Sequence, residues 1–177
     1  MSDDITNAQH EVELGFLEDI FVALGYDSVH LFERSEELSL PTLAVGLEAD
    51  AKGRGKNLAL AFYPVAEFED TNFLQYYIEL PFEVDQEGQE RLLPLLPYVN
   101  QRLVIGHFGM TDGENKLHYR YVQALPSLDM ITEDKVKDVI AIVEYSPVLF
   151  EGILEQTATG VVSLDQARRL VEQQLSE

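Results

Sequence analysis

Between residues 42 and 82 the chain places apolar side chains at every second position, which is the period of a β-strand whose two faces meet different surroundings. Three segments show this period, with apolar positions at Leu43, Val45 and Leu47, at Leu58, Leu60 and Phe62, and at Leu74, Tyr76, Ile78, Leu80 and Phe82. A glycine-rich segment, residues 50–56, separates the first two and can close a hairpin. The region therefore predicts a sheet with one buried face.

A second hairpin is predicted at residues 104–121, around the turn sequence Asp-Gly-Glu-Asn at 112–115. Pairing Thr111 with Lys116 assigns the buried face to Phe108, Met110, Leu117, Tyr119 and Tyr121. The same pairing leaves His107, His118 and Arg120 accessible on the other face. A slip of one residue would turn every side chain to the other face of the sheet, so the burial of these residues tests the predicted register directly.

Segments with the period of a helix lie before, between and after these strands in the sequence. Residues 8–24 carry an apolar stripe at Val12, Phe16, Leu17, Ile20, Phe21 and Leu24, and Gly25 supplies a stop. Residues 86–101 also show a helical pattern, but Pro94 and Pro97 interrupt it, which predicts a bent helix or two short ones. A long helix is expected at 132–155, and Ser163 with Gln166 forms a capping box for a final helix.

The order of elements predicts an α+β fold. We expect an antiparallel sheet of about five strands, with helices 8–24 and 132–155 packed on one face. Residues 28–33 are a candidate for a short first strand. The chain of 177 residues has the size of one domain. Residues 1–160 are expected to form that domain, and residues 161–177 to be an appended C-terminal helix.

The net charge of −20 limits the classes of partner. Residues 1–51 hold twelve acids and one base, Arg34. Proteins that bind nucleic acid instead have clustered lysine and arginine side chains, which neutralise the phosphates. This charge is either a solubilising surface or a field that steers a basic partner segment. Apolar stretches end short of the roughly 18 residues that a membrane span needs. With no cysteine and an acidic start, the sequence predicts a cytoplasmic protein that binds neither nucleic acid nor membranes.

Candidate catalytic groups are sparse. The histidines are His10, His30, His107 and His118, none in a metal-ligand spacing, and the imidazoles of His107 and His118 alone leave a metal short of ligands. No serine lies in a G-x-S-x-G elbow. We therefore predict no enzyme, no metal and no cofactor. An enzyme that uses scattered carboxylates with His107 or His118 is a third hypothesis, after a binding module and a small-molecule sensor.

The basic segment 52–56, Lys-Gly-Arg-Gly-Lys, lacks the spacing of a phosphate-binding loop. It is interpreted as a solvated hairpin tip. The alternatives are a site for an anionic ligand, or a contact with the acidic face of a second copy.

Aromatic residues are concentrated between 62 and 82, and two of them break the alternation. Phe73 and Tyr77 fall on the face opposite Leu74, Tyr76 and Ile78. Apolar rings on a nominally solvated face indicate a second buried layer or an interface. Phe73 and Tyr77 are therefore the predicted binding residues, through which two copies could form a homodimer. A covering by helix 163–176 would explain them equally well.

The motifs of residues 96–121 resemble the YbjN-like family. They are Leu-Pro-Tyr-Val-Asn-Gln-Arg-Leu at 96–103, Gly-His-Phe at 106–108 and Leu-His-Tyr-Arg-Tyr at 117–121, and the resemblance extends over roughly residues 7–156. Members of this family are described as bacterial sensory-transduction regulators and are similar in fold to type III secretion chaperones. The chain departs from the pattern at Pro94, at Pro97 and in the helix after Ser163.

The resemblance implies a sheet-and-helix platform, acidic and often dimeric, along which partner segments bind, and it brings no catalytic residue. The sequence thus predicts a non-catalytic protein-binding module, chaperone-like or regulatory. The alternative is a small-molecule sensor with a pocket between helix 8–24 and the sheet. The identity of the protein partner is left open.

Overall fold

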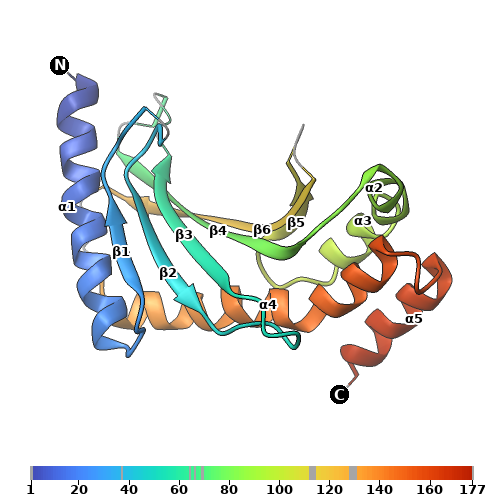
Figure 1. The fold of residues 1–177 in the computed structure, drawn as a ribbon. Coiled ribbons are helices and arrows are strands. Elements are labelled where there is room, and N and C mark those ends of the chain that lie inside the picture. Colours follow the sequence, from blue (N-terminus) through green and yellow to red (C-terminus); the bar gives the residue numbers. More distant parts are fainter. Residues whose placement is uncertain are drawn as a thin grey trace. The chain divides into compact units, whose positions relative to one another are not determined.

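The computed structural model of the chain describes residues 2–36, 38–63, 65, 67–68, 70–111, 115–127 and 131–176, with side chains described from residue 8 onward. Within these residues there are five helices and six strands (Figure 1). The helices are α1 (Ser2–Ala23), α2 (Gln86–Leu92), α3 (Leu96–Asn100), α4 (Glu133–Ala158) and α5 (Leu164–Gln174). The strands are β1 (Val29–Phe32), β2 (Thr42–Leu47), β3 (Lys56–Tyr63), β4 (Thr71–Glu83), β5 (His107–Met110) and β6 (Lys116–Pro126). The predicted types and order of the elements are confirmed.

The strands form one antiparallel sheet in the order β1-β2-β3-β4-β6-β5. The α+β class is therefore confirmed, while the predicted number of about five strands is corrected to six within the described residues. The difference comes from β1. Although β1 is only four residues long, each of its residues pairs with β2, from Val29 with Val45 to Phe32 with Thr42.

The fold gathers into two compact units. Unit 1 contains Met1–Tyr77 and Tyr121–Ile140, and unit 2 contains Ile78–Arg120 and Ala141–Glu177. Strands β4 and β6 and helix α4 run through both. The expected division into a domain, 1–160, and an appended helix, 161–177, stays a prediction. In the part of the chain that the structure describes, no helix is both long and apolar enough to cross a membrane.

In unit 1, α1 packs against β1, β2 and β3. Its buried side chains are His10, Leu14, Leu17 and Phe21, and the His10 ring stacks on Phe62 with 4.7 Å between ring centroids. The predicted stripe was partly wrong, because Val12 and Phe16 are exposed. The helix carries apolar residues on two opposite sides, so periodicity alone could not decide which side is buried.

In unit 2, the proline-interrupted segment forms two short helices, as predicted. Helix α2 ends at Leu92, before Pro94, and Pro97 lies in the first turn of α3. A proline is tolerated there because the first turn of a helix has no internal partner for its backbone N–H groups. The Asp85 carboxylate caps α2 by accepting a 2.7 Å hydrogen bond from Gly88 N.

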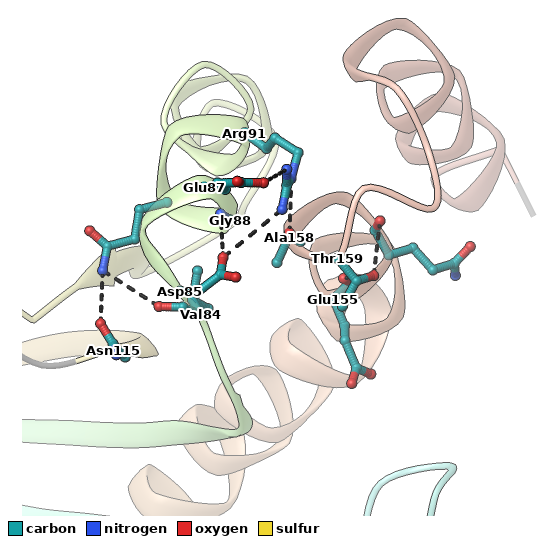
Figure 2. A network of polar contacts seen from close by, with 11 residues as sticks. Val84, Asp85, Glu87, Gly88, Arg91, Asn115, Glu155, Ala158 and Thr159 are labelled. Carbon is teal, nitrogen blue, oxygen red and sulfur yellow. Dashed lines mark hydrogen bonds and ion pairs between the residues drawn. The ribbon is translucent and has the colours of Figure 1, made fainter.

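The carboxyl end of α4 is completed by a residue from α2 (Figure 2). The last turn of α4 contains no basic residue, but the Arg91 Nε donates a 3.0 Å hydrogen bond to the Ala158 carbonyl. Arg91 also pairs with Glu87 at 3.2 Å. A positive charge at this position offsets the negative end of the helix dipole. Helix α5 begins with the predicted capping box, since Ser163 N donates to Gln166 Oε1 at 2.9 Å and Ser163 Oγ accepts from Gln166 N at 3.4 Å.

Candidate functional site

In unit 1, α1 packs on the side of the sheet that carries Leu58, Leu60 and Phe62. Because side chains alternate along a strand, Ala59 lies on the opposite side. The register extends this second side across three strands, since Ala59 is opposite Ala44, and Ala44 is opposite His30. Small side chains therefore form the middle of that side.

Aromatic rings surround these small side chains. Phe32 of β1 is 48% exposed and Tyr63 of β3 is 45% exposed. On β4, Asn72 donates a 3.4 Å hydrogen bond to Glu13 of α1, so Asn72 and the buried Leu74 and Tyr76 face α1. Phe73 and Tyr77 therefore lie on the opposite side, where they are half-buried. Phe68, which is 55% exposed, packs edge-on against Phe73 with 5.5 Å between centroids. We name the set Phe32, Ala44, Ala59, Tyr63, Phe68, Phe73 and Tyr77 the aromatic sheet face.

The structure thus places both predicted residues, Phe73 and Tyr77, on a larger apolar surface. Their role in binding stays a prediction. Phe32 was missed because its place on this side depends on the pairing of β1 with β2, which the sequence does not state. Exposed aromatic rings on one side of a sheet suit contact with a polypeptide.

The hairpin of β5 and β6 in unit 2 has the predicted register. Thr111 N donates to the Lys116 carbonyl at 3.2 Å, and Phe108 lies opposite Tyr119. Phe108 and Tyr119 are buried, as expected. Met110 is only half-buried, because β5 is an edge strand and Met110 is its last residue. Tyr121, assigned to unit 1, is also half-buried rather than buried. Residues 112–114 of the predicted turn lie outside the described residues.

The opposite side of this hairpin carries the histidines. His107 is exposed, while His118 and Arg120 are half-buried. The His118 ring lies over Gly109, where an added Cβ would be 2.9 Å from Nε2, and its Nδ1 is 3.3 Å from Thr111 Oγ1. Within the described residues, no group of three or more histidine, cysteine or acidic side chains could hold a metal ion.

The His118 side chain should make stability depend on pH. Partial burial lowers its pKa, and the charges of His107 and Arg120 lower it further, whereas Glu79 raises it. The folded protein therefore holds fewer protons on this imidazole than the unfolded chain, so the free energy of unfolding falls as pH drops through about 6.5. We expect His118→Gln to lose less stability than the wild type between pH about 7.5 and 5.5 in urea unfolding. An equal loss in both proteins would contradict this.

The basic segment 52–56 is organised by an acid. Asp50 Oδ1 accepts from the backbone N of Lys52 at 2.9 Å and of Arg54 at 2.8 Å, and Asp50 Oδ2 accepts from Arg54 Nε at 2.7 Å. Desolvation raises the pKa of Asp50, but the hydrogen bonds from Arg54 and Lys52 outweigh it and leave the pKa below its usual value. Because Arg54 pairs with Asp50 inside the turn, the geometry favours the hairpin-tip interpretation over an anion site.

The motif residues of the family resemblance have structural contacts in unit 2. Asn100, at the end of α3, donates from Nδ2 to the Phe108 carbonyl at 2.9 Å and accepts from Phe108 N at 2.8 Å. The Tyr119 hydroxyl donates to the Ile105 carbonyl at 2.7 Å. Gly106 has a φ of 70°, and an added Cβ would lie 2.5 Å from the Tyr119 hydroxyl. We name Asn100, Gly106, Phe108 and Tyr119 the β5 lock, because these contacts fix strand β5.

Comparisons with known proteins identify no family. No family model matches the chain, and no curated protein sequence matches it. Among solved structures, the chain is similar to YbjN from E. coli, described as a proposed transcription regulator, with 15% identity and a TM-score of 0.46 over 83% of this chain and 93% of that one. A similarity at this level carries no argument about function. The YbjN-like family and the chaperone-like fold therefore stay predictions.

Proposed function

We propose that this protein is a non-catalytic binding module, chaperone-like or regulatory, that holds another polypeptide on its aromatic sheet face. The observation that carries the proposal is the exposure of Phe32, Tyr63 and Phe68, at 48%, 45% and 55%, around one side of the sheet in unit 1. Soluble proteins seldom leave a large contiguous apolar patch in water unless it serves an interaction.

The shape of the face favours a polypeptide over a small molecule. Because Ala44 and Ala59 have small side chains, a partner segment can approach the strands closely in the middle of the face. The aromatic rings on either side then provide contact area. Between α1 and the sheet, Leu17 and Phe21 are fully buried against the apolar side of the strands. This packing does not favour a small-molecule pocket at that place.

A second copy of the chain is the first occupant to test. Phe73 and Tyr77 are already half-buried, so burying the rest of each ring in a dimer contributes roughly 1 kcal/mol per ring. Repulsion between two chains of charge −20 opposes association, and salt screens it beyond about 10 Å. We therefore expect sedimentation velocity to show a dimer that strengthens from low to moderate salt. The Phe73→Ser/Tyr77→Ser variant should remain monomeric.

Two controls separate the face from general effects of exposed apolar side chains. Leu93→Ser/Val104→Ser removes two exposed residues of unit 2 and should still dimerise. Phe32→Ser/Tyr63→Ser changes the more exposed rings of the face and should weaken the dimer while keeping the thermal midpoint. A wild type that stays monomeric at high micromolar concentration would exclude the homodimer. Pull-down with wild type and Phe73→Ser/Tyr77→Ser would then test a different protein partner, and equal recovery on both would contradict the proposal.

A further inference from the structure

Helix α1 has an apolar stripe on the side that faces away from the sheet. The buried positions are His10, Leu14, Leu17 and Phe21, at spacings of four, three and four residues. Positions displaced by two residues from these lie on the opposite side of a helix, and they are Ala8, Val12, Phe16, Asp19 and Ala23, all exposed. Val12 is 60% exposed and Phe16 is 57% exposed, one turn apart. The outward stripe therefore presents two adjacent apolar anchors to solvent.

The charge around this stripe has a single sign. Helix α1 contains six acids and no lysine or arginine, and the acids are Asp3, Asp4, Glu11, Glu13, Glu18 and Asp19. Asp19 lies in the stripe itself, one turn after Phe16. Glu13 accepts hydrogen bonds from Gln9 at 3.1 Å and from Asn72 at 3.4 Å, which hold its carboxylate beside the helix. An apolar stripe inside an acidic field is complementary to a segment that is both apolar and basic.

We propose that the outward stripe of α1 binds a basic amphipathic helix of another protein. Apolar side chains of the partner pack on Val12 and Phe16, and its Lys or Arg side chains pair with Glu11, Glu18 and Asp19. A helix is the matching shape, because residues spaced by three and four form ridges that fit between those of a second helix. The site is separate from the aromatic sheet face and goes beyond the function proposed above.

Charge disfavours the two other natural occupants of such a stripe. A second α1 would bring six further acids and no compensating lysine or arginine within the helix, so two copies repel at this surface. An anionic lipid surface attracts basic helices and repels this one. A basic partner alone gains both the apolar contact and the charge pairing.

The test uses the full chain and a synthetic probe, a labelled peptide with two repeats of Leu-Lys-Lys-Leu-Leu-Lys-Leu. Fluorescence anisotropy at about 0.15 M NaCl compares it with a permuted peptide of equal composition that lacks the helical period. We expect the amphipathic peptide to bind at least about tenfold more tightly than the permuted one. The Val12→Ser/Phe16→Ser variant should lose about tenfold or more of that affinity, because both anchors are removed.

Matched variants make the result specific. Val161→Ser removes an apolar side chain that is 70% exposed and lies outside α1, and it should leave binding unchanged. Phe32→Ser/Tyr63→Ser should also leave it unchanged, so failure of the aromatic sheet face and failure of the α1 stripe are distinguishable. Equal affinity for both peptides, or equal affinity of wild type and Val12→Ser/Phe16→Ser, would overturn the proposal. Self-association that is lost in Val12→Ser/Phe16→Ser would also overturn it.

Discussion

Replacing Gly106 by alanine is expected to lower the free energy of unfolding by roughly 3 kcal/mol or more. The φ of Gly106 is 70°, where a side chain is strained, and the added Cβ would lie 2.5 Å from the Tyr119 hydroxyl and 2.9 Å from the Arg120 carbonyl. The Tyr119 ring cannot easily withdraw, because it is fully buried and its hydroxyl donates to Ile105. Urea unfolding should show a lower midpoint with little change in slope.

The matched control is Gly53→Ala. Gly53 has a φ of 78°, but no atom lies within 4 Å of the position of an added Cβ. This variant carries the backbone strain without the collision, so we expect a loss of only about 1 kcal/mol. Equal losses in Gly106→Ala and Gly53→Ala would show that the contact with Tyr119 contributes nothing.

The second large effect is expected from Asn100→Asp. The amide of Asn100 both donates to and accepts from the backbone of Phe108, which the exchange of NH₂ for O⁻ makes impossible. A carboxylate keeps the hydrogen bond from Phe108 N but turns its other oxygen toward the Phe108 carbonyl. At neutral pH the free energy of unfolding should fall by about 2 kcal/mol or more, since the carbonyl loses its donor and two oxygens repel.

The pH dependence of Asn100→Asp has a definite sign. A protonated carboxyl could again donate to the Phe108 carbonyl, so the folded state raises the pKa of this introduced acid above its unfolded value of about 3.9. The folded variant then binds more protons than the unfolded one, and it regains stability relative to the wild type as pH falls from about 7.5 to about 5. Asn100→Leu should lose stability without this recovery, and Asn57→Asp, at an exposed position of β3, should change little. Absence of recovery in Asn100→Asp would contradict the role of its donor.

The histidine face of the hairpin shows how far the sequence determines structure. The alternation of Phe108, His107 and their partners, with the turn sequence at 112–115, was sufficient to predict the pairing of Phe108 with Tyr119. A wrong register would have exposed a fully buried tyrosine, so only one pairing satisfies the pattern. Turn residues and period two carry this information locally.

The contacts that bind distant segments had no such local signal. Arg91 completes the end of α4 from another helix, and Asn100 pairs with the edge strand eight residues later through its side chain. The sequence signal for the β5 lock was the resemblance motif, which named the residues without their roles. From the sequence alone, a polar side chain is expected to contact solvent. Only the tertiary structure shows that a backbone group lies beside it and forms a hydrogen bond with it.

By itself, the sequence determined the strands, the hairpin register, the two short helices around Pro94 and Pro97, and the capping box at Ser163, because period, turn chemistry and caps depend on residues close in the chain. Only the tertiary structure decided that α1 buries Leu14 and exposes Val12 and Phe16, and that Phe32 joins Phe73 and Tyr77 on the aromatic sheet face. Both choices depend on which side of an element meets the rest of the protein. A helix with apolar residues on two sides, or a strand with unknown neighbours, leaves that choice to packing.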